Sequence, residues 1–86
     1  MREVVSDPVD VIATFVHGAR GVTVRPHYIK WQNKRYKIDT FGLYHPERRG
    51  TRLFHIFSFS CDRTAFRVEL DPDTLEWQLT EVFYGD

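Results

Sequence analysis

The sequence predicts an all-β fold, an antiparallel meander of five to six strands curled into a small SH3-like barrel or half-barrel. Aromatic residues make up 15% of the 86-residue chain, and their side chains pack well on a pleated sheet. Apolar residues alternate with polar ones in several short runs, which is the period of a strand. No segment keeps the i, i+3, i+4 apolar spacing over the length that a helix needs.

A chain of this length builds one hydrophobic core, so we expect a single small β domain over residues 9–86. Residues 1–8 are expected to form a flexible N-terminal tail. The sequence contains neither a run long enough to span a membrane nor the apolar core of a signal peptide. Its single cysteine, Cys61, cannot form an internal disulfide. This fits a reducing compartment, and we expect a cytoplasmic protein with no membrane partner.

The first expected strand, Val9–Val16, alternates with apolar residues on both faces, as in a strand that is covered on both sides. The two glycines in His17–Gly21 predict a turn, and Val22–Val24 then resumes the extended structure. Pro26 removes a backbone donor, so a bend or an edge position is expected there.

The stretch His27–Ile38 has the pattern of a β-hairpin, with apolar residues alternating on either side of a short polar break. We expect Asn33-Lys34 as its two-residue loop. That register places Trp31 opposite Tyr36 and Ile29 opposite Ile38, and it puts four aromatic or basic side chains together on the other face: Tyr28, Lys30, Arg35 and Lys37.

Further strands are expected in four segments: Tyr36–Tyr44, Leu53–Ser60, Ala65–Leu70 and Leu75–Tyr84. The last strand should contain a bulge or end near Thr80–Val82, because Glu81 would otherwise point inward. Asp71–Thr74 is a strong turn signal, since Asp can bond back to the backbone and the proline presets φ.

These turns predict strand registers. Asp71–Thr74 sets Leu70 against Leu75, and a two-residue Asp62-Arg63 loop sets Phe59 against Phe66. The core predicted from these registers is Ile29, Trp31, Tyr36, Ile38, Phe57, Phe59, Phe66, Val68, Leu70, Trp77 and Leu79.

The net charge is zero but unevenly distributed. Residues 11–38 hold six basic side chains and no acid, whereas residues 62–86 hold two bases and seven acids. Strands of opposite charge could pair, or the basic half could meet an anionic partner.

Nothing in the sequence predicts an enzyme, a cofactor or a metal site. The histidines, at positions 17, 27, 45 and 55, lack the paired spacing of zinc ligands. His55 is expected opposite Leu70 as a hydrogen-bonded core residue. Glu69 and Glu76 are expected to face each other across the last hairpin.

Two classes of binding function remain. The first is protein–protein interaction, or self-association, through an apolar sheet face or an edge strand. Phe54 and Ile56 favour it, because they point away from the predicted core and need a cover. Either the Val9–Val16 strand or a second copy of the chain could supply that cover.

The alternative is single-stranded nucleic-acid binding through the 28–39 hairpin, by Tyr28, Lys30, Arg35 and Lys37. In the predicted register Lys30 faces Lys37, and like charges at facing positions destabilise a hairpin. An acid nearby, either Asp39 or the Glu69/Glu76 pair, or an anionic ligand would offset this cost. The near-neutral chain argues against a dedicated nucleic-acid module.

Four short motifs stand out along the chain: Arg25-Pro26, Ile29-x-Trp31 followed by Arg35-Tyr36-x-Ile38, Phe66-x-Val68-x-Leu70 and Trp77-x-Leu79. Through these motifs the chain resembles, over residues 9–84, a group of short uncharacterised bacterial proteins, a domain of unknown function. The resemblance implies no established activity and no site residues.

Overall fold

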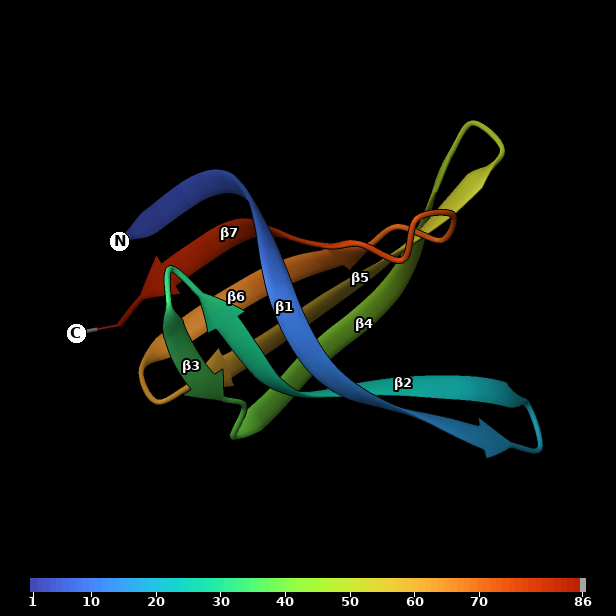
Figure 1. Ribbon diagram of the computed structural model, residues 1–86, viewed down its shortest axis with the longest axis horizontal. Helices are drawn as coiled ribbons and strands as arrows, with labels where there is room; N and C mark the ends of the chain where they lie inside the picture. Colours follow the sequence, from blue (N-terminus) through green and yellow to red (C-terminus); the bar gives the residue numbers. More distant parts are fainter. Residues whose placement is uncertain (86) are drawn as a thin grey trace.

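A computed structural model describes residues 1–85, and their regular structure is entirely β (Figure 1). The strands form one antiparallel sheet in the order β3-β2-β1-β7-β6-β5-β4. There are seven strands in this sheet rather than five or six, because the expected Tyr36–Tyr44 strand is interrupted at Ile38–Asp39. Their bounds are β1 Arg2–Gly18, β2 Gly21–Trp31, β3 Lys34–Lys37, β4 Thr40–Arg49, β5 Arg52–Cys61, β6 Thr64–Leu70 and β7 Trp77–Tyr84.

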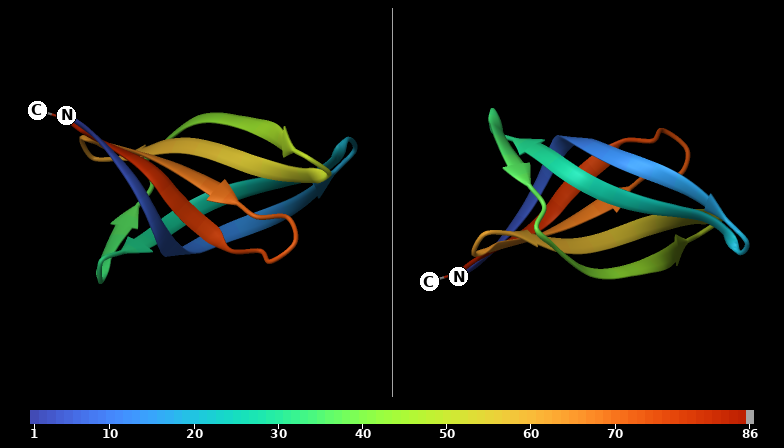
Figure 2. Two further views of the ribbon diagram at one scale, coloured as in Figure 1. Left: turned by 90° about the horizontal axis from the view of Figure 1, so that it is seen from above. Right: turned by 90° about the horizontal axis from the view of Figure 1, so that it is seen from below.

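The sheet is strongly curled, so the expected half-barrel is confirmed (Figure 2). Its two edge strands, β3 and β4, follow each other in the chain and are joined by Ile38 and Asp39. The Ile38 N–H donates to the carbonyl of His27 at 2.9 Å, and the Asp39 N–H donates to that of Ser60 at 3.0 Å. The chain therefore crosses from one edge of the sheet to the other at this point. Away from it, the β1–β2 and β4–β5 hairpins diverge.

Residues 1–8 are not a separate tail, contrary to expectation. β1 begins at Arg2, and its first half pairs with β7 from Arg2 opposite Phe83 to Val9 opposite Trp77. Its second half pairs with β2, beginning with Asp10 opposite Lys30. Without this segment β7 would be an unpaired edge, so pairing overrides the weak local pattern around Pro8. The expected domain, 9–86, also ends one residue beyond the described part of the chain.

The core on the concave face contains the predicted residues. Each of them is either buried in the main hydrophobic cluster or, like Tyr36, Ile38 and Trp77, packs against it. The sequence reading missed Val9, Cys61 and Val82, which are also buried there. Val9 belongs to the half of β1 that was not expected to pair with β7. Cys61 lies next to the predicted Asp62-Arg63 turn, and Val82 lies in the predicted bulge, so neither was assigned to the core.

The β5–β6 hairpin has the predicted register, with Phe59 opposite Phe66 and His55 opposite Leu70. The β6–β7 register is different, because Leu70 pairs with Trp77 and not with Leu75. Glu69 consequently faces Gln78, so the expected Glu69/Glu76 pair does not form.

The β6–β7 loop is longer than predicted because hydrogen bonds to Asp71 stabilise it. Its carboxylate accepts the N–H groups of Asp73 and Thr74, and its carbonyl accepts the N–H of Leu75 at 2.9 Å. Leu75 has a φ of 65° and so cannot continue a strand. The bulge expected near Thr80–Val82 is confirmed, since Leu79 faces Val68 while Glu81 faces Arg67.

Candidate functional site

The loop of the β2–β3 hairpin is Gln32-Asn33, one residue earlier than predicted. Both residues have positive φ, 52° and 63°, as a type I′ turn requires, and this twist matches that of the flanking strands. Ile29 therefore pairs with Tyr36, and Trp31 with Lys34. Each residue of one strand is therefore paired with the residue two positions earlier than predicted on the other strand. A shift of two residues keeps every side chain on its predicted face of the hairpin.

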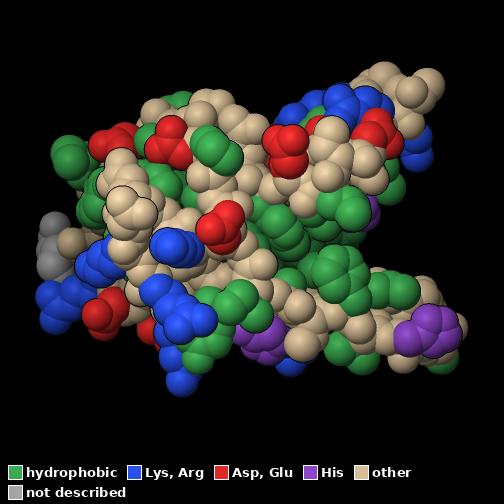
Figure 3. Space-filling model, viewed as in Figure 1, with side chains coloured by type: hydrophobic (Ala, Val, Ile, Leu, Met, Phe, Trp, Pro, Cys, Tyr) green, Lys and Arg blue, Asp and Glu red, His purple; other side chains and the backbone are tan. Residues whose placement is uncertain are grey.

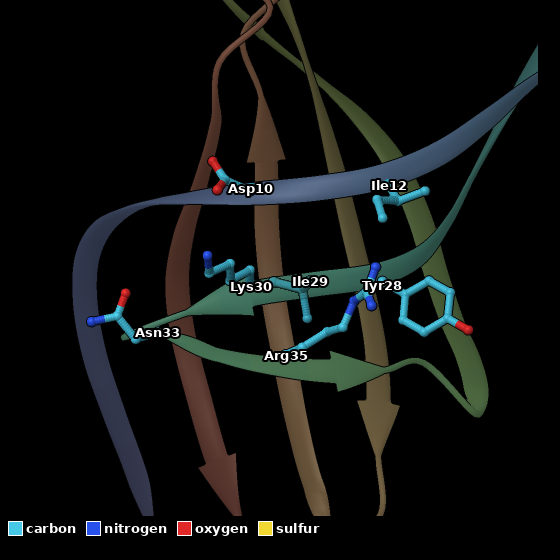
Figure 4. Close-up of a pocket in the computed structure, with 7 residues that line it drawn as sticks. All are labelled: Asp10, Ile12, Tyr28, Ile29, Lys30, Asn33 and Arg35. Carbon is cyan, nitrogen blue, oxygen red and sulfur yellow. The ribbon is translucent and has the colours of Figure 1, made fainter.

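The four predicted anion-binding residues do lie together on the convex face of this hairpin. Tyr28 pairs with Lys37, and Lys30 pairs with Arg35 rather than with Lys37 as predicted. A cavity of about 410 Å³ is lined by Tyr28, Lys30, Arg35, Asn33, Ile29, Asp10 and Ile12 (Figure 4). The Arg35 guanidinium lies 4.8 Å from the centroid of the Tyr28 ring and covers one of its faces.

The acids expected beside these lysines lie elsewhere. The Asp39 carboxylate accepts the N–H of Asp62 at 2.7 Å, and Glu69 binds Arg49. On β1, Asp10 stands opposite Lys30 in the pairing register. Among residues 1–85, no ion pair joins an acid to Lys30 or Lys37. The predicted neutralisation by Asp39 or Glu69/Glu76 is therefore wrong.

The chain itself covers Ile56 fully and Phe54 in part, and the contacts over Phe54 come from two arginine side chains. Ile56 is fully buried, at 0% exposure, and Phe54 is half-buried. The guanidinium groups of Arg49 and Arg52 lie 4.4 and 4.7 Å from the centroid of the Phe54 ring.

Carboxylates hold both arginines over this ring. Arg49 is paired with Glu47 and Glu69, and Arg52 is paired with Asp71 and Asp73. Three acids of the C-terminal third, Glu69, Asp71 and Asp73, thus pair with the β4–β5 turn, and Glu81 pairs with Arg2. Phe54 and Ile56 do not form a free apolar face.

A groove that the sequence reading missed runs between β2 and β4, and we call it the β2–β4 groove. Its inner part, about 220 Å³, is lined by Val22, Thr23, Val24, Phe41, Tyr44, His55 and Phe57. It continues into a hollow of about 340 Å³ lined by Thr23, Val24, Arg25, Pro26, His27, Ile38, Asp39 and Phe41. Figure 3 shows hydrophobic side chains gathered in the notch between the two diverging hairpins.

The groove is open because two strand edges beside it lack partners. β3 pairs with Tyr28–Trp31 and Ile38 bonds to the carbonyl of His27, so β2 from Gly21 to Pro26 has a strand on the β1 side alone. β4 pairs with β5 alone. Pro26 and Pro46 lie on these edges, where a missing N–H costs no ladder bond. Pro26 was the sequence signal for this edge, but no local signal places β4 across from it.

Apolar side chains on both banks of the groove are accessible. Val22 is 58% exposed and Phe41 is 44% exposed. Tyr44 packs on Phe57 with ring centroids 5.0 Å apart, and its hydroxyl hydrogen-bonds to Nδ1 of His55 at 2.8 Å. His55 is thus hydrogen-bonded as predicted, but it is only partly buried and lines the groove rather than lying in the core.

The cysteine and the possible metal-binding side chains do not form a reactive site within the described residues. Burial, together with the charges of Asp39 and Asp62, raises the pKa of the Cys61 thiol to about 11, which disfavours the nucleophilic thiolate. Among residues 1–85, no three His, Cys, Asp or Glu side chains are placed to hold a metal ion. The same residues include no helix long and apolar enough to cross a membrane.

Comparison of the chain with protein families, with curated proteins and with solved structures finds no match. The groove and the basic hairpin face are the features of the molecule that point to a function.

Proposed function

We propose that this protein is a non-catalytic interaction module that binds an extended segment of a partner protein in the β2–β4 groove. The supporting observation is that two unpaired strand edges border one continuous, mainly apolar groove. The single, unpaired Cys61 is compatible with the reducing cytoplasm, where we expect the module to act.

Strand addition explains both features of the groove. A segment lying between the edges would hydrogen-bond to β2 or β4 through its backbone, and its alternate side chains would face the apolar floor. Exposed edges beside apolar side chains promote aggregation, and proteins usually protect them. Here Val22 and Phe41 stand beside such edges and are 58% and 44% exposed.

Two valines of the β1–β2 hairpin provide a matched test. Val22 lines the groove and is 58% exposed, whereas Val16 is 56% exposed and is not among the groove residues. We would titrate ¹⁵N-labelled protein with a capped ten-residue peptide of alternating valine and serine. We expect amide shifts along residues 22–25 and 40–45, with affinity lowered severalfold by Val22→Ser and unchanged by Val16→Ser. Absent shifts, or equal effects of the two substitutions, would contradict the proposal.

Single-stranded nucleic-acid binding is the second candidate, because Tyr28, Lys30, Arg35 and Lys37 share one face. The cover of Arg35 over Tyr28 and the neighbouring Asp10 weigh against it. A ten-nucleotide oligothymidylate at low salt tests this function. Binding that is weakened by Lys30→Ala with Lys37→Ala would support it. Unchanged binding in that double variant, or no binding at all, would exclude it.

A further inference from the structure

We infer that the partner segment pairs with β2 and not with β4, as an antiparallel strand hydrogen-bonded to the backbones of Val22 and Val24. This inference rests on the proposed function and adds the edge, the direction and the residue pattern that the segment requires. Its basis is the direction in which the backbone groups of each edge strand point.

On β2, the tip of the β1–β2 hairpin fixes these directions. Gly18 pairs with Gly21 across a two-residue loop, so these two residues exchange backbone hydrogen bonds. Successive residues of a strand point their backbone groups to opposite sides, so Thr23 also bonds to β1. The N–H and C=O groups of Val22 and Val24 therefore point away from β1.

The position of Pro26 supports this assignment. It lies two residues beyond Val24, with no register shift between them, and so belongs to the outward-pointing set. Proline has no N–H and occurs in sheets where that side of the strand faces no partner. Within residues 1–85, no strand pairs with β2 on this side at Val22 or Val24. Each of the two valines thus offers one donor and one acceptor to an added strand.

β4 offers no equivalent pair of residues. Arg49 pairs with Arg52 across a two-residue loop, so the same alternation points the backbones of Pro46 and Tyr44 away from β5. Pro46 supplies no donor. On the other side of Tyr44, the register shifts before Phe41 and breaks the regular spacing of a strand. Two donors and two acceptors at strand spacing are therefore found on the β2 edge.

The pairing determines which residues of the segment enter the groove. All neighbouring strands in the sheet are antiparallel, and antiparallel pairing is slightly the more stable arrangement. Residues directly opposite each other in such a pair carry their side chains on the same face. Val22 and Val24 both line the groove. The two residues of the segment that bond to them therefore also turn their side chains into the groove.

The groove favours apolar side chains at these two positions. Tyr44 and Phe57 present aromatic rings there, and the Tyr44 hydroxyl is already hydrogen-bonded to Nδ1 of His55 at 2.8 Å. The inferred segment is therefore apolar–x–apolar. Both apolar residues must keep their backbone N–H and so are not proline, whereas the residue between them points its backbone away from β2.

A second copy of this chain fits the edge less well than a single segment. Its β2 edge carries β1 hydrogen-bonded alongside, and its β4 edge carries β5. An edge strand of a second copy would bring that neighbour with it toward the opposite bank of the groove. A segment without a paired neighbour has no such conflict.

Hydrogen exchange of ¹⁵N-labelled protein tests the inference, with the capped ten-residue valine–serine peptide as the probe. In the free protein, the amides of Val22 and Val24 should exchange faster than that of Thr23, which bonds to β1. Peptide at about ten times its dissociation constant should slow exchange at both valines about tenfold. The amides of Tyr44 and Arg48 on β4 should be unaffected.

Two N-methylated forms of the peptide are matched controls, one methylated on every valine and the other on every serine. Methylated valine has no N–H to donate to β2, so the first form should bind at least about tenfold more weakly than the parent peptide. The second form should bind as the parent does. Sliding the peptide by two residues does not restore the lost donors.

Two proline substitutions test the edges of the protein itself. Val24→Pro removes an outward N–H from β2 and leaves the bonds to β1, and it should weaken binding about tenfold. Arg48→Pro removes the corresponding N–H from β4, two residues beyond Pro46, and should leave binding unchanged. The ¹⁵N spectrum shows whether each variant is folded. If Val24→Pro is not, the exchange and methylation results decide.

The outcomes separate the two proposals. If the parent peptide does not bind, the proposed function fails and the inferred pairing fails with it. If it binds but protects Tyr44 and Arg48 instead of the two valines, only the pairing is overturned. Serine methylation that weakens binding as much as valine methylation has the same meaning. Protection of Val22 and Val24 in the free protein, with a dimer in sedimentation, would assign the edge to a second copy and overturn the inference.

Discussion

The indole N–H of Trp31 donates a hydrogen bond to the Asp7 carboxylate at 2.9 Å and so joins the end of β2 to the first half of β1. Trp31 is buried beside the core, and Asp7 lies in the part of β1 that pairs with β7. This bond spans the bend at which β1 leaves β7 and turns to β2. It therefore links the two halves of the sheet.

We predict that Trp31→Phe lowers the free energy of unfolding by about 2 kcal/mol, because it leaves the Asp7 carboxylate without this donor and also reduces packing. Asp7→Ala should lower the free energy of unfolding by a similar amount, because it leaves the buried indole N–H of Trp31 without an acceptor. Urea unfolding of both single variants and of the double variant measures the coupling, which should be about 1 kcal/mol or more. Additive effects would show that the bond contributes little.

The conformation of the Gln32-Asn33 loop indicates a pair of substitutions that should stabilise the protein. Gln32 and Asn33 both adopt positive φ, a conformation in which Asn-Gly is strongly preferred. Gln32→Asn combined with Asn33→Gly should raise the free energy of unfolding by about 1 kcal/mol, as measured by urea unfolding. If the loop were Asn33-Lys34, the same double change would fall outside the correct positions and would not stabilise the protein. The corresponding change at Asn33 and Lys34 is the control.

Asp71 predicts a pH dependence of stability. The Arg52 guanidinium, followed by the N–H of Asp73, lowers the pKa of the Asp71 carboxyl from 3.8 to about 2. A lowered pKa in the folded state stabilises the protein above the ordinary value, and this contribution is lost as the pH falls through about 2.

The measurement compares wild type with Asp71→Asn by urea unfolding from pH 6 to pH 2. Wild type should be the more stable protein at pH 6, and the difference should shrink toward pH 2. A difference that stays constant across this range would show that the Asp71 carboxylate is not stabilised as described. Asp73→Asn, at a more exposed partner of Arg52, is the control and should show a smaller effect.

Cys61 should be protected from alkylation in the folded protein. Burial raises the pKa of its thiol from 9.0 to about 11, so at pH 8 the thiolate fraction falls about a hundredfold. Iodoacetamide should therefore modify Cys61 at least about a hundred times more slowly in buffer than in denaturing urea, as followed by mass spectrometry. Comparable rates in the two conditions would mean that the β5 end opens readily or that the thiol is not buried.

The residues by themselves determined most of the side chains that enter the core, although Val9, Cys61 and Val82 were missed. Alternation places Phe57, Phe59, Phe66 and Val68 on one face, and this assignment holds in every strand where it was made. The two-residue Asp62-Arg63 loop was also predictable, because a tight turn between two alternating runs leaves one register that buries both apolar faces.

Local signals were insufficient where a longer loop was also possible. The Asp71 carboxylate stabilises a loop that reaches Glu76, so the tight turn predicted at Asp71–Thr74 gave the wrong partner for Leu70. At Gln32-Asn33 the twist of the paired strands selected the turn, although no glycine marks the position. Both cases depend on the geometry of paired strands, which a single segment does not contain.

The sequence by itself determined the all-β class, the core face and the uneven distribution of charge. Only the tertiary structure decided that residues 2–8 pair with β7, that Arg49 and Arg52 cover Phe54, and that unpaired edges of β2 and β4 border one groove. Strand period and turn chemistry act over a few residues and are visible in the chain. Edge pairing and sheet curl bring distant residues together, and they depend on the free energy of the whole sheet.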